Sequence, residues 1–101
     1  MLRDLFLGFI KIHILHHAGQ RPVYGLWLME ELARHGYTIS PGTLYPTLHS
    51  LEREGYLTSE KHVVEGRRRR YYTLTPEGAA ALAEARVRLA ELVAEVLEVR
   101  E

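Results

Sequence analysis

The chain of 101 residues contains no cysteine and no long apolar run. The absence of cysteine excludes a disulfide scaffold, a thiol nucleophile and any zinc site built on thiolates, and it is typical of a reducing compartment. No apolar run approaches the roughly 18 residues that a membrane span needs. The apolar start, residues 1–15, is interrupted by Asp4, Lys11 and His13 and is followed by no small-residue cleavage pattern. We therefore expect a cytoplasmic protein with no membrane partner.

The chain also lacks net charge, because 13 basic side chains balance 13 acidic ones. That balance differs from the strongly basic composition of many nucleic-acid binders. The total conceals a division along the chain: residues 1–75 carry 10 basic and 7 acidic groups, whereas residues 76–101 carry 3 and 6. The first part, at 10 − 7 = +3, can face a polyanion, while the second part, at 3 − 6 = −3, is expected to face elsewhere.

Two helices are expected before residue 37. Apolar residues fall on nearly every side of the first, residues 2–16, so we expect it to be covered on more than one face. The second is expected from about Val23 to Arg34 and to be ended by Gly36. Its predicted core stripe consists of Leu26, Met29, Leu32 and Ala33.

A third helix is predicted from Ser40-Pro41 to about Glu54. The serine side chain is placed to accept the free amide protons of the helix start, and proline suits the first helical position. Leu44, Leu48 and Leu51 recur at spacings of four and three and predict the buried face. The opposite face begins with small and polar residues: Gly42, Thr43, Pro46, His49, Ser50 and Arg53.

The remainder of the chain predicts a hairpin and a last helix. Two β-rich runs flank the turn residues Glu65-Gly66. Thr75-Pro76-Glu77 then starts a helix that is expected to reach nearly to Glu101. Its apolar residues follow a heptad seam that predicts a helix–helix interface, widened by Val93 and Leu97: Leu82, Ala85, Leu89, Leu92, Val96 and Val99. The expected fold is mainly α with a small β hairpin: a winged helix-turn-helix DNA-binding domain in residues 1–75 and a C-terminal dimerisation helix in residues 76–101.

Such a fold predicts where DNA would bind. The third helix would enter the major groove with its N-terminal residues against base edges, and its N-terminus would attract phosphate. Arginines 67–70 repel one another, a repulsion that a polyanion relieves, and strand alternation points two of the four the same way. The predicted DNA-binding residues are Tyr24, Ser40, Gly42, Thr43, Tyr45, His49, Ser50, Arg67, Arg68 and Arg69. The alternatives are that Ser40 only caps its helix, that Tyr45 only packs, and that the arginines form a solvated strand edge.

Metal binding and catalysis receive less support. His13 and His17 stand four apart on the first predicted helix, with His16 adjacent, which is a spacing that metal sites use. Because no carboxylate lies nearby in the sequence, we expect helix-end or interface roles for them and predict no metal and no cofactor. The chain contains no glycine-rich phosphate loop and no nucleophile elbow, so an enzyme is not expected.

Several strings in this order resemble the PadR family of bacterial transcriptional regulators, over residues 24–78. They are Tyr24-Gly25, then Gly42-Thr43-Leu44-Tyr45-Pro46-Thr47-Leu48, then Leu51-Glu52-Arg53-Glu54-Gly55-Tyr56-Leu57, and finally residues 66–78, GRRRRYYTLTPEG. The resemblance implies a homodimeric repressor whose last helix packs against the first and last helices of its partner. A two-fold dimer would place two recognition helices about 34 Å apart on a palindromic double-stranded operator. The single last helix resembles the short subfamily.

The resemblance also implies that a small aromatic or amphipathic effector can release DNA, as in many family members. Residues 76–101 contain no aromatic side chain, so a pocket that stacks flat ligands there is not expected. The interface between Phe6, Phe9 and Ile10 and Leu89, Val93 and Val96 is either an effector site or dimer core. The predicted dimer residues are Leu5, Phe6, Phe9, Leu82, Leu89, Leu92, Val93 and Val96. The alternative function is a dimeric winged-helix module that binds protein without binding DNA.

Overall fold

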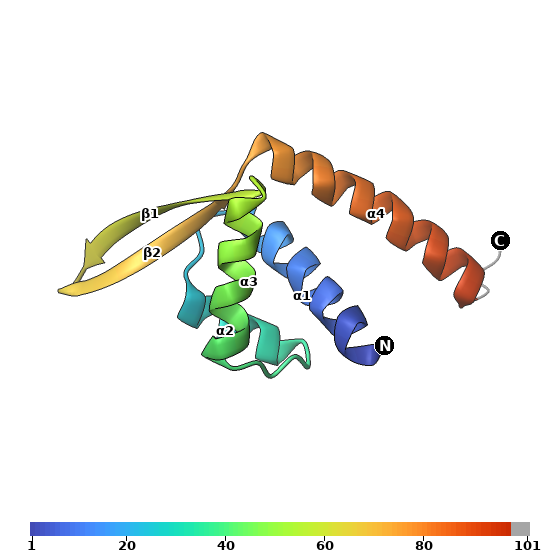
Figure 1. Cartoon of the computed structure of the whole chain (residues 1–101), viewed down its shortest axis with the longest axis horizontal. Coiled ribbons are helices and arrows are strands. Elements are labelled where there is room, and N and C mark those ends of the chain that lie inside the picture. The colour runs from blue at the N-terminus through green and yellow to red at the C-terminus, as the bar shows by residue number, and fades with distance from the viewer. Residues whose placement is uncertain (98–101) are drawn as a thin grey trace.

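The computed structural model describes residues 1–97, and its elements follow the predicted order (Figure 1). They are α1 (Leu2–Ala18), α2 (Gly25–Arg34), α3 (Pro41–Arg53), β1 (Leu57–Val64), β2 (Arg67–Leu74) and α4 (Pro76–Val96). The prediction of a mainly α fold with one small hairpin is therefore confirmed. The predicted continuation of the last helix toward Glu101, and the seam position Val99, lie outside the described residues.

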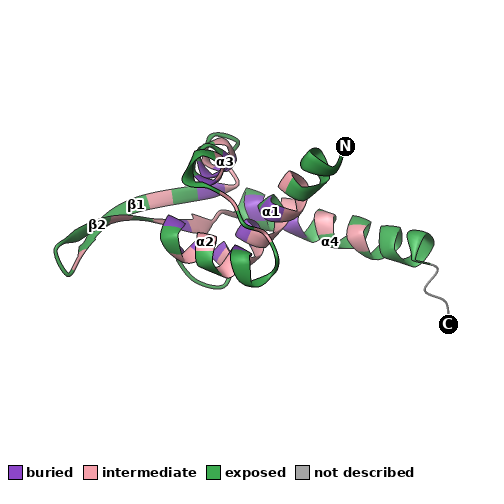
Figure 2. Cartoon of the chain, turned by 90° about the horizontal axis from the view of Figure 1, so that it is seen from below, coloured by how far each residue is buried: buried purple, intermediate pink, exposed green. Residues whose placement is uncertain are grey.

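The hydrophobic core lies where α1, α2 and α3 meet the base of the hairpin. Ile14, Leu28 and Leu48, one from each helix, have no exposed surface. Figure 2 shows the buried segments of the three helices gathered there, whereas the far part of α4 is exposed. The hairpin and α4 extend from this core in opposite directions (Figure 1), which gives a molecule of 53 × 28 × 22 Å.

The predicted core stripe of the second helix is partly wrong. Leu32 is buried, but its partner on the core face is Leu28, one turn earlier. Leu26 is 49% exposed, Met29 is half-buried and Ala33 is exposed. Sequence periodicity is compatible with two neighbouring stripes of apolar residues on α2. Packing of α2 against α1 and α3 buries the stripe that contains Leu28 and Leu32.

The residues before α2 form part of the sheet rather than of the helix. Val23, predicted as the first helical residue, pairs with Tyr72 of β2 in an isolated antiparallel bridge. Its amide donates to the Tyr72 carbonyl at 3.0 Å, and the Tyr72 amide donates to the Val23 carbonyl at 2.7 Å. Both side chains are at least 98% buried. This bridge fixes the base of the hairpin against the start of α2.

The buried face of α3 is as predicted, but its predicted cap is not. Leu44, Leu48 and Leu51 are buried, and the Thr47 hydroxyl donates to the Thr43 carbonyl at 2.8 Å. Ser40 is the N-cap residue, yet its side chain makes no capping hydrogen bond. Its backbone carbonyl instead accepts from the Leu44 amide at 2.9 Å. The hydroxyl of Ser40 is therefore not used to stabilise the start of α3.

The hairpin is joined by a two-residue turn. Val64 pairs with Arg67 across the turn, and both Glu65 and Gly66 have positive φ, of 53° and 78°. Two positive values define the type I′ turn, whose twist matches that of the flanking strands. The antiparallel register then runs without interruption to Leu57 opposite Leu74.

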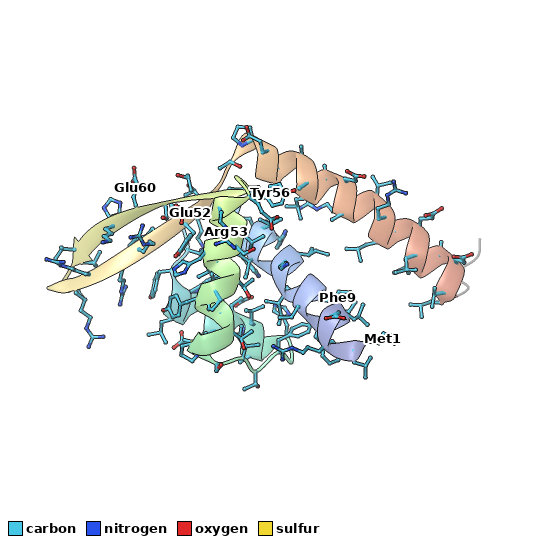
Figure 3. All side chains as sticks on the ribbon, viewed as in Figure 1. Met1, Phe9, Glu52, Arg53, Tyr56 and Glu60 are labelled. Carbon is cyan, nitrogen blue, oxygen red and sulfur yellow. The ribbon has the colours of Figure 1, made fainter. Side chains whose placement is uncertain are left out.

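The start of α4 is fixed to the corner between α3 and β1. The Thr75 hydroxyl accepts from the Gly78 amide at 2.9 Å, which confirms the predicted cap, and donates to the Gly55 carbonyl. The Thr75 amide donates to the Tyr56 carbonyl at 3.1 Å. Figure 3 shows Tyr56 at this corner, close to Glu52 and Arg53 at the end of α3.

We expect Thr75→Ala to lower the free energy of unfolding by about 1–2 kcal/mol, since it removes a helix cap together with a second hydrogen bond. Urea unfolding followed by circular dichroism measures this change. The matched control is Ser40→Ala, which changes an N-cap residue that makes no capping bond and should cost less than about 0.5 kcal/mol. Equal losses in the two variants would contradict the assignment.

The first half of α4 packs on α1, and its second half is open. Leu82 is buried within the chain, whereas Leu92, Val93 and Val96 are 49%, 42% and 63% exposed. Among the helices of residues 1–97, none combines the length and the hydrophobicity of a membrane span.

Candidate nucleic-acid interface

A groove separates the hairpin from the start of α2 and the first half of α3. Its wall includes Tyr24, Gly25 and Leu26 at the start of α2, Tyr45 from α3, and Arg67 to Arg70 from β2. These lining residues carry four guanidinium groups and no carboxylate, so an anion is the ligand that the groove favours. The fold thus brings together five of the residues predicted to bind DNA: Tyr24, Tyr45, Arg67, Arg68 and Arg69.

The close approach of α2 and α3 at this groove depends on Gly25. A side-chain carbon at this position would collide with the Tyr45 hydroxyl and lie 2.7 Å from two carbon atoms of its ring. The Tyr45 side chain therefore lies over the backbone of α2, and 38% of it remains exposed. Tyr45 therefore packs against α2, which was the alternative role considered for it, and it is also exposed to the groove.

The arginines of β2 differ in the side chains that they contact. The Arg69 guanidinium lies over the Tyr24 ring, 4.2 Å from its centre, and the Tyr24 ring meets Tyr71 edge-on at 5.4 Å. Arg70 donates to the Ser59 hydroxyl at 2.9 Å, and that hydroxyl donates to Glu52 of α3 at 2.8 Å.

Arg67 and Arg68, next to the turn, are exposed. The hairpin of β1 and β2, residues 57–74, is called the wing. It has two arginines oriented by protein contacts, Arg69 and Arg70, and two that project into solvent.

The residues predicted on α3 do not all face this groove. Gly42, Tyr45 and His49 occupy one helix face at spacings of three and four, and Gly42 and His49 are exposed. Ser40 and Thr43 instead line a separate depression toward α1, beside Arg3 and Phe6. Ser50 is half-buried, with its hydroxyl 3.4 Å from the Glu54 carboxylate.

Sequence reasoning missed three residues of the groove. Gly25 and Leu26 line it, although Leu26 was assigned to the core, and Arg70 was left out of the arginine set. The signal for Gly25 was available, because a glycine at a helix start beside Tyr24 indicates close backbone approach. No periodicity distinguishes Leu26, which is exposed because the core buries the face of α2 that carries Leu28 and Leu32.

A second surface of the chain is apolar. On α1, Leu2, Leu5 and Phe6 are 56%, 41% and 47% exposed. Figure 3 shows Met1, directly before α1, and Phe9 of α1 on the side of the molecule far from the wing. A groove between α1 and α4 continues this surface and is lined by Phe9, Ile12, His13, His16, Tyr37, Leu82, Arg86 and Leu89. Contiguous exposed apolar surface of this kind marks an interaction site.

The family model of the "Transcriptional regulator PadR-like family" matches residues 14–84, which cover α1 from Ile14 through the first part of α4. The chain belongs to the PadR-like transcriptional regulator family.

Individual relatives agree with the family assignment. This PadR-like regulator is 56% identical over 96 residues to the transcriptional regulator Rv3488 of Mycobacterium tuberculosis, covering 95% of this chain and 90% of the relative. A PadR family transcriptional regulator from Eggerthella lenta has a similar structure, with a TM-score of 0.80 and 34% identity over 99% of this chain and 91% of its own. A Streptococcus transcriptional regulator gives a TM-score of 0.84 at 26% identity, over 96% and 97%.

Proposed function

We propose that this PadR-like regulator is a homodimeric, sequence-specific DNA-binding repressor of the cytoplasm. The observation that carries the proposal is the groove of four arginines and two tyrosines between the wing and α3. The hairpin that carries the arginines extends from the core on the opposite side from the exposed half of α4 (Figure 1). DNA binding and self-association therefore use separate surfaces of one small chain.

In the proposed complex, α3 enters the major groove of double-stranded DNA. Gly42, Tyr45 and His49 share the face that approaches the bases, and Gly42 allows close contact at the helix start. Arg67 and Arg68, next to the turn of the wing, contact the phosphate backbone or enter a narrow minor groove of the DNA. The unused Ser40 hydroxyl, with Thr43, contacts phosphate at the N-terminus of α3, where the helix dipole favours an anion. Ser50 and Tyr24 contact the DNA at the margins of this surface.

The proposed dimer covers the apolar surface of α1 and α4. Leu5, Phe6, Leu92, Val93 and Val96 are exposed in a single chain, and a symmetric partner would bury them. Phe9 and Leu89 line the groove between the helices and take part in the same contact. Leu82, predicted as an interface residue, is already buried within its own chain. Its role in the proposed dimer is to support the contacting residues from inside the chain. The dimer would present two copies of α3 to a palindromic operator.

The groove between α1 and α4 also supports an effector site. Its apolar walls suit a small hydrophobic or aromatic molecule, and ligand and partner chain would compete for or share these walls. A ligand that favours one dimer geometry would change the spacing of the two α3 helices and release DNA.

The test is fluorescence anisotropy with a duplex from upstream of the protein's own gene and with a shuffled duplex, at about 50 and 200 mM salt. Six or more phosphate contacts predict a loss of about a thousandfold or more in affinity over this range. Preference for the upstream duplex supports a specific regulator. Equal, salt-sensitive binding to both duplexes contradicts specificity for that site. No binding by a folded dimer at the lower salt overturns the proposal and favours the protein-interaction module.

A further inference from the structure

Three of the six histidines converge between α1 and α2. His13 and His17 extend from neighbouring turns of α1, and His35 follows the last residue of α2. One ring nitrogen from each lies within 4.8 Å of the others. His16, which the sequence placed with this group, instead approaches Arg86 of α4 at 3.3 Å. The fold therefore replaces His16 with His35. This residue is 22 positions from His13 and 18 from His17 in the sequence, so no local spacing would have selected it.

The carboxylate that the sequence did not place near these histidines comes from α2. Glu31 Oε2 lies 3.1 Å from His35 Nε2 and 3.7 Å from His17 Nε2. In a tetrahedral site with metal–ligand bonds of about 2.0–2.1 Å, neighbouring ligand atoms lie about 3.3–3.4 Å apart. The two observed distances fall on either side of that value. His13 is the third imidazole of the cluster, with a ring nitrogen within 4.8 Å of those of His17 and His35.

The neighbouring side chains orient the cluster. Arg34 Nη1 donates to Glu31 Oε1 at 2.9 Å, which leaves Oε2 facing the imidazoles. The Trp27 ring meets His17 edge-on at 5.4 Å, and the Tyr37 ring meets His13 at 5.4 Å. Only 11% of the Glu31 side chain and 13% of the His17 side chain are exposed. Outer contacts of this kind orient the side chains that bind a metal.

The protonation state also suits metal binding. Burial, reinforced by the positive charge of neighbouring histidines, lowers the pKa of His13 below its ordinary value. Burial likewise lowers the pKa of His17, although Glu31 opposes the shift. Both shifts favour the neutral ring, which is the form that binds a metal.

We propose that His13, His17, His35 and Glu31 form a binding site for a first-row divalent transition metal ion, with Zn²⁺ as the reference ion. Three imidazole nitrogens and one carboxylate oxygen are ligands that Zn²⁺ accepts in tetrahedral geometry. The site would fasten the second half of α1, which leads into the proposed dimer surface, to the end of α2, which packs on α3. Any effect of the metal on DNA rests on the proposed function, so the test measures metal binding alone.

The experiment uses the full chain without an affinity tag, stripped with a chelator, and titrated with Zn²⁺ in a calorimeter and with Co²⁺ by visible absorption. We expect one ion per chain and the intense absorption of four-coordinate Co²⁺. The double variant His17→Ala/His35→Ala should bind Zn²⁺ at least about 100-fold more weakly, and Glu31→Gln about 10- to 100-fold more weakly. The matched control is His49→Ala/His62→Ala, which removes two exposed histidines outside the cluster and should bind Zn²⁺ like the original chain.

Two results would overturn the site. One is the absence of stoichiometric Zn²⁺ binding by the folded original chain. The other is an equal loss of affinity in the cluster variant and in the control variant, which would indicate adventitious binding by surface histidines. Helix content by circular dichroism verifies folding of each variant. If the double variant does not fold, His35→Ala alone decides, because that side chain is 46% exposed and its removal disturbs little packing.

Discussion

Replacing Arg67 and Arg68 by alanine in both chains of the proposed dimer is expected to weaken DNA binding by about a thousandfold or more at about 0.1 M salt, and to leave folding unchanged. If each guanidinium neutralises one phosphate, the slope of log K against log salt becomes shallower by about 0.9 per arginine, which is about 1.8 for each chain and about 3.6 for the proposed dimer. Both side chains are exposed beside the turn. Anisotropy titrations at several salt concentrations measure the affinity and the slope together.

The matched control is Arg88→Glu, which lowers the charge of each chain by the same two units. Arg88 is also exposed, but it lies on α4, the helix that points away from the wing (Figure 1). We expect the control to bind DNA within about threefold of the original chain, with nearly the same slope, because distant surface charges are screened at this salt. A control as weak as the wing variant would mean that only overall charge matters. An unchanged wing variant would remove the wing from the proposed interface.

Replacing Gly78 by alanine is expected to lower the free energy of unfolding by about 2–3 kcal/mol. A side-chain carbon there would collide with the Tyr56 carbonyl oxygen and lie 2.6 Å from Leu74 Cδ1. Gly78 is itself buried, in the first turn of α4. Because the main obstacle is backbone, a change of side-chain rotamer cannot relieve it, and the corner must open. Thermal or urea unfolding measures the loss.

Gly42→Ala is the matched control, since this glycine also occupies the first turn of a helix, directly after Pro41. A side-chain carbon there would meet only the Ser40 hydroxyl, at 3.6 Å, which is an ordinary contact. Alanine has the higher helix propensity, so the control should keep or slightly raise stability. Equal destabilisation of both variants would refute the close contact at Gly78 as the cause.

The sequence predicted the elements because their signals are local. Leucine spacing fixed the buried face of α3, and Thr75-Pro76 marked the start of α4. The errors arose where the outcome depends on packing. Periodicity cannot choose between Leu26 and Leu28, and a capping serine cannot be distinguished from one whose hydroxyl stays free.

The residues of the candidate sites also divide into those with a local sequence signal and those that only packing brings together. The arginines were found because four adjacent like charges are conspicuous in any sequence. The cluster of His35 and Glu31 with His13 and His17 was not found, because it depends on the end of α2 lying against α1. Gly25 had a local signal, but its partner Tyr45 is 20 residues away and is identified only by the crossing of α2 and α3.

The anchored start of α4 has a mechanical consequence. With 21 residues at about 1.5 Å each, α4 is a lever of roughly 31 Å. Its fulcrum is the corner at Thr75 and Tyr56, which also ends α3 and begins the wing. A tilt of about 5° about this fulcrum moves the far end by about 2.7 Å. Conversely, a small displacement of the far end of α4 translates into a change of angle at α3 and the wing, with no loose segment between them to absorb it.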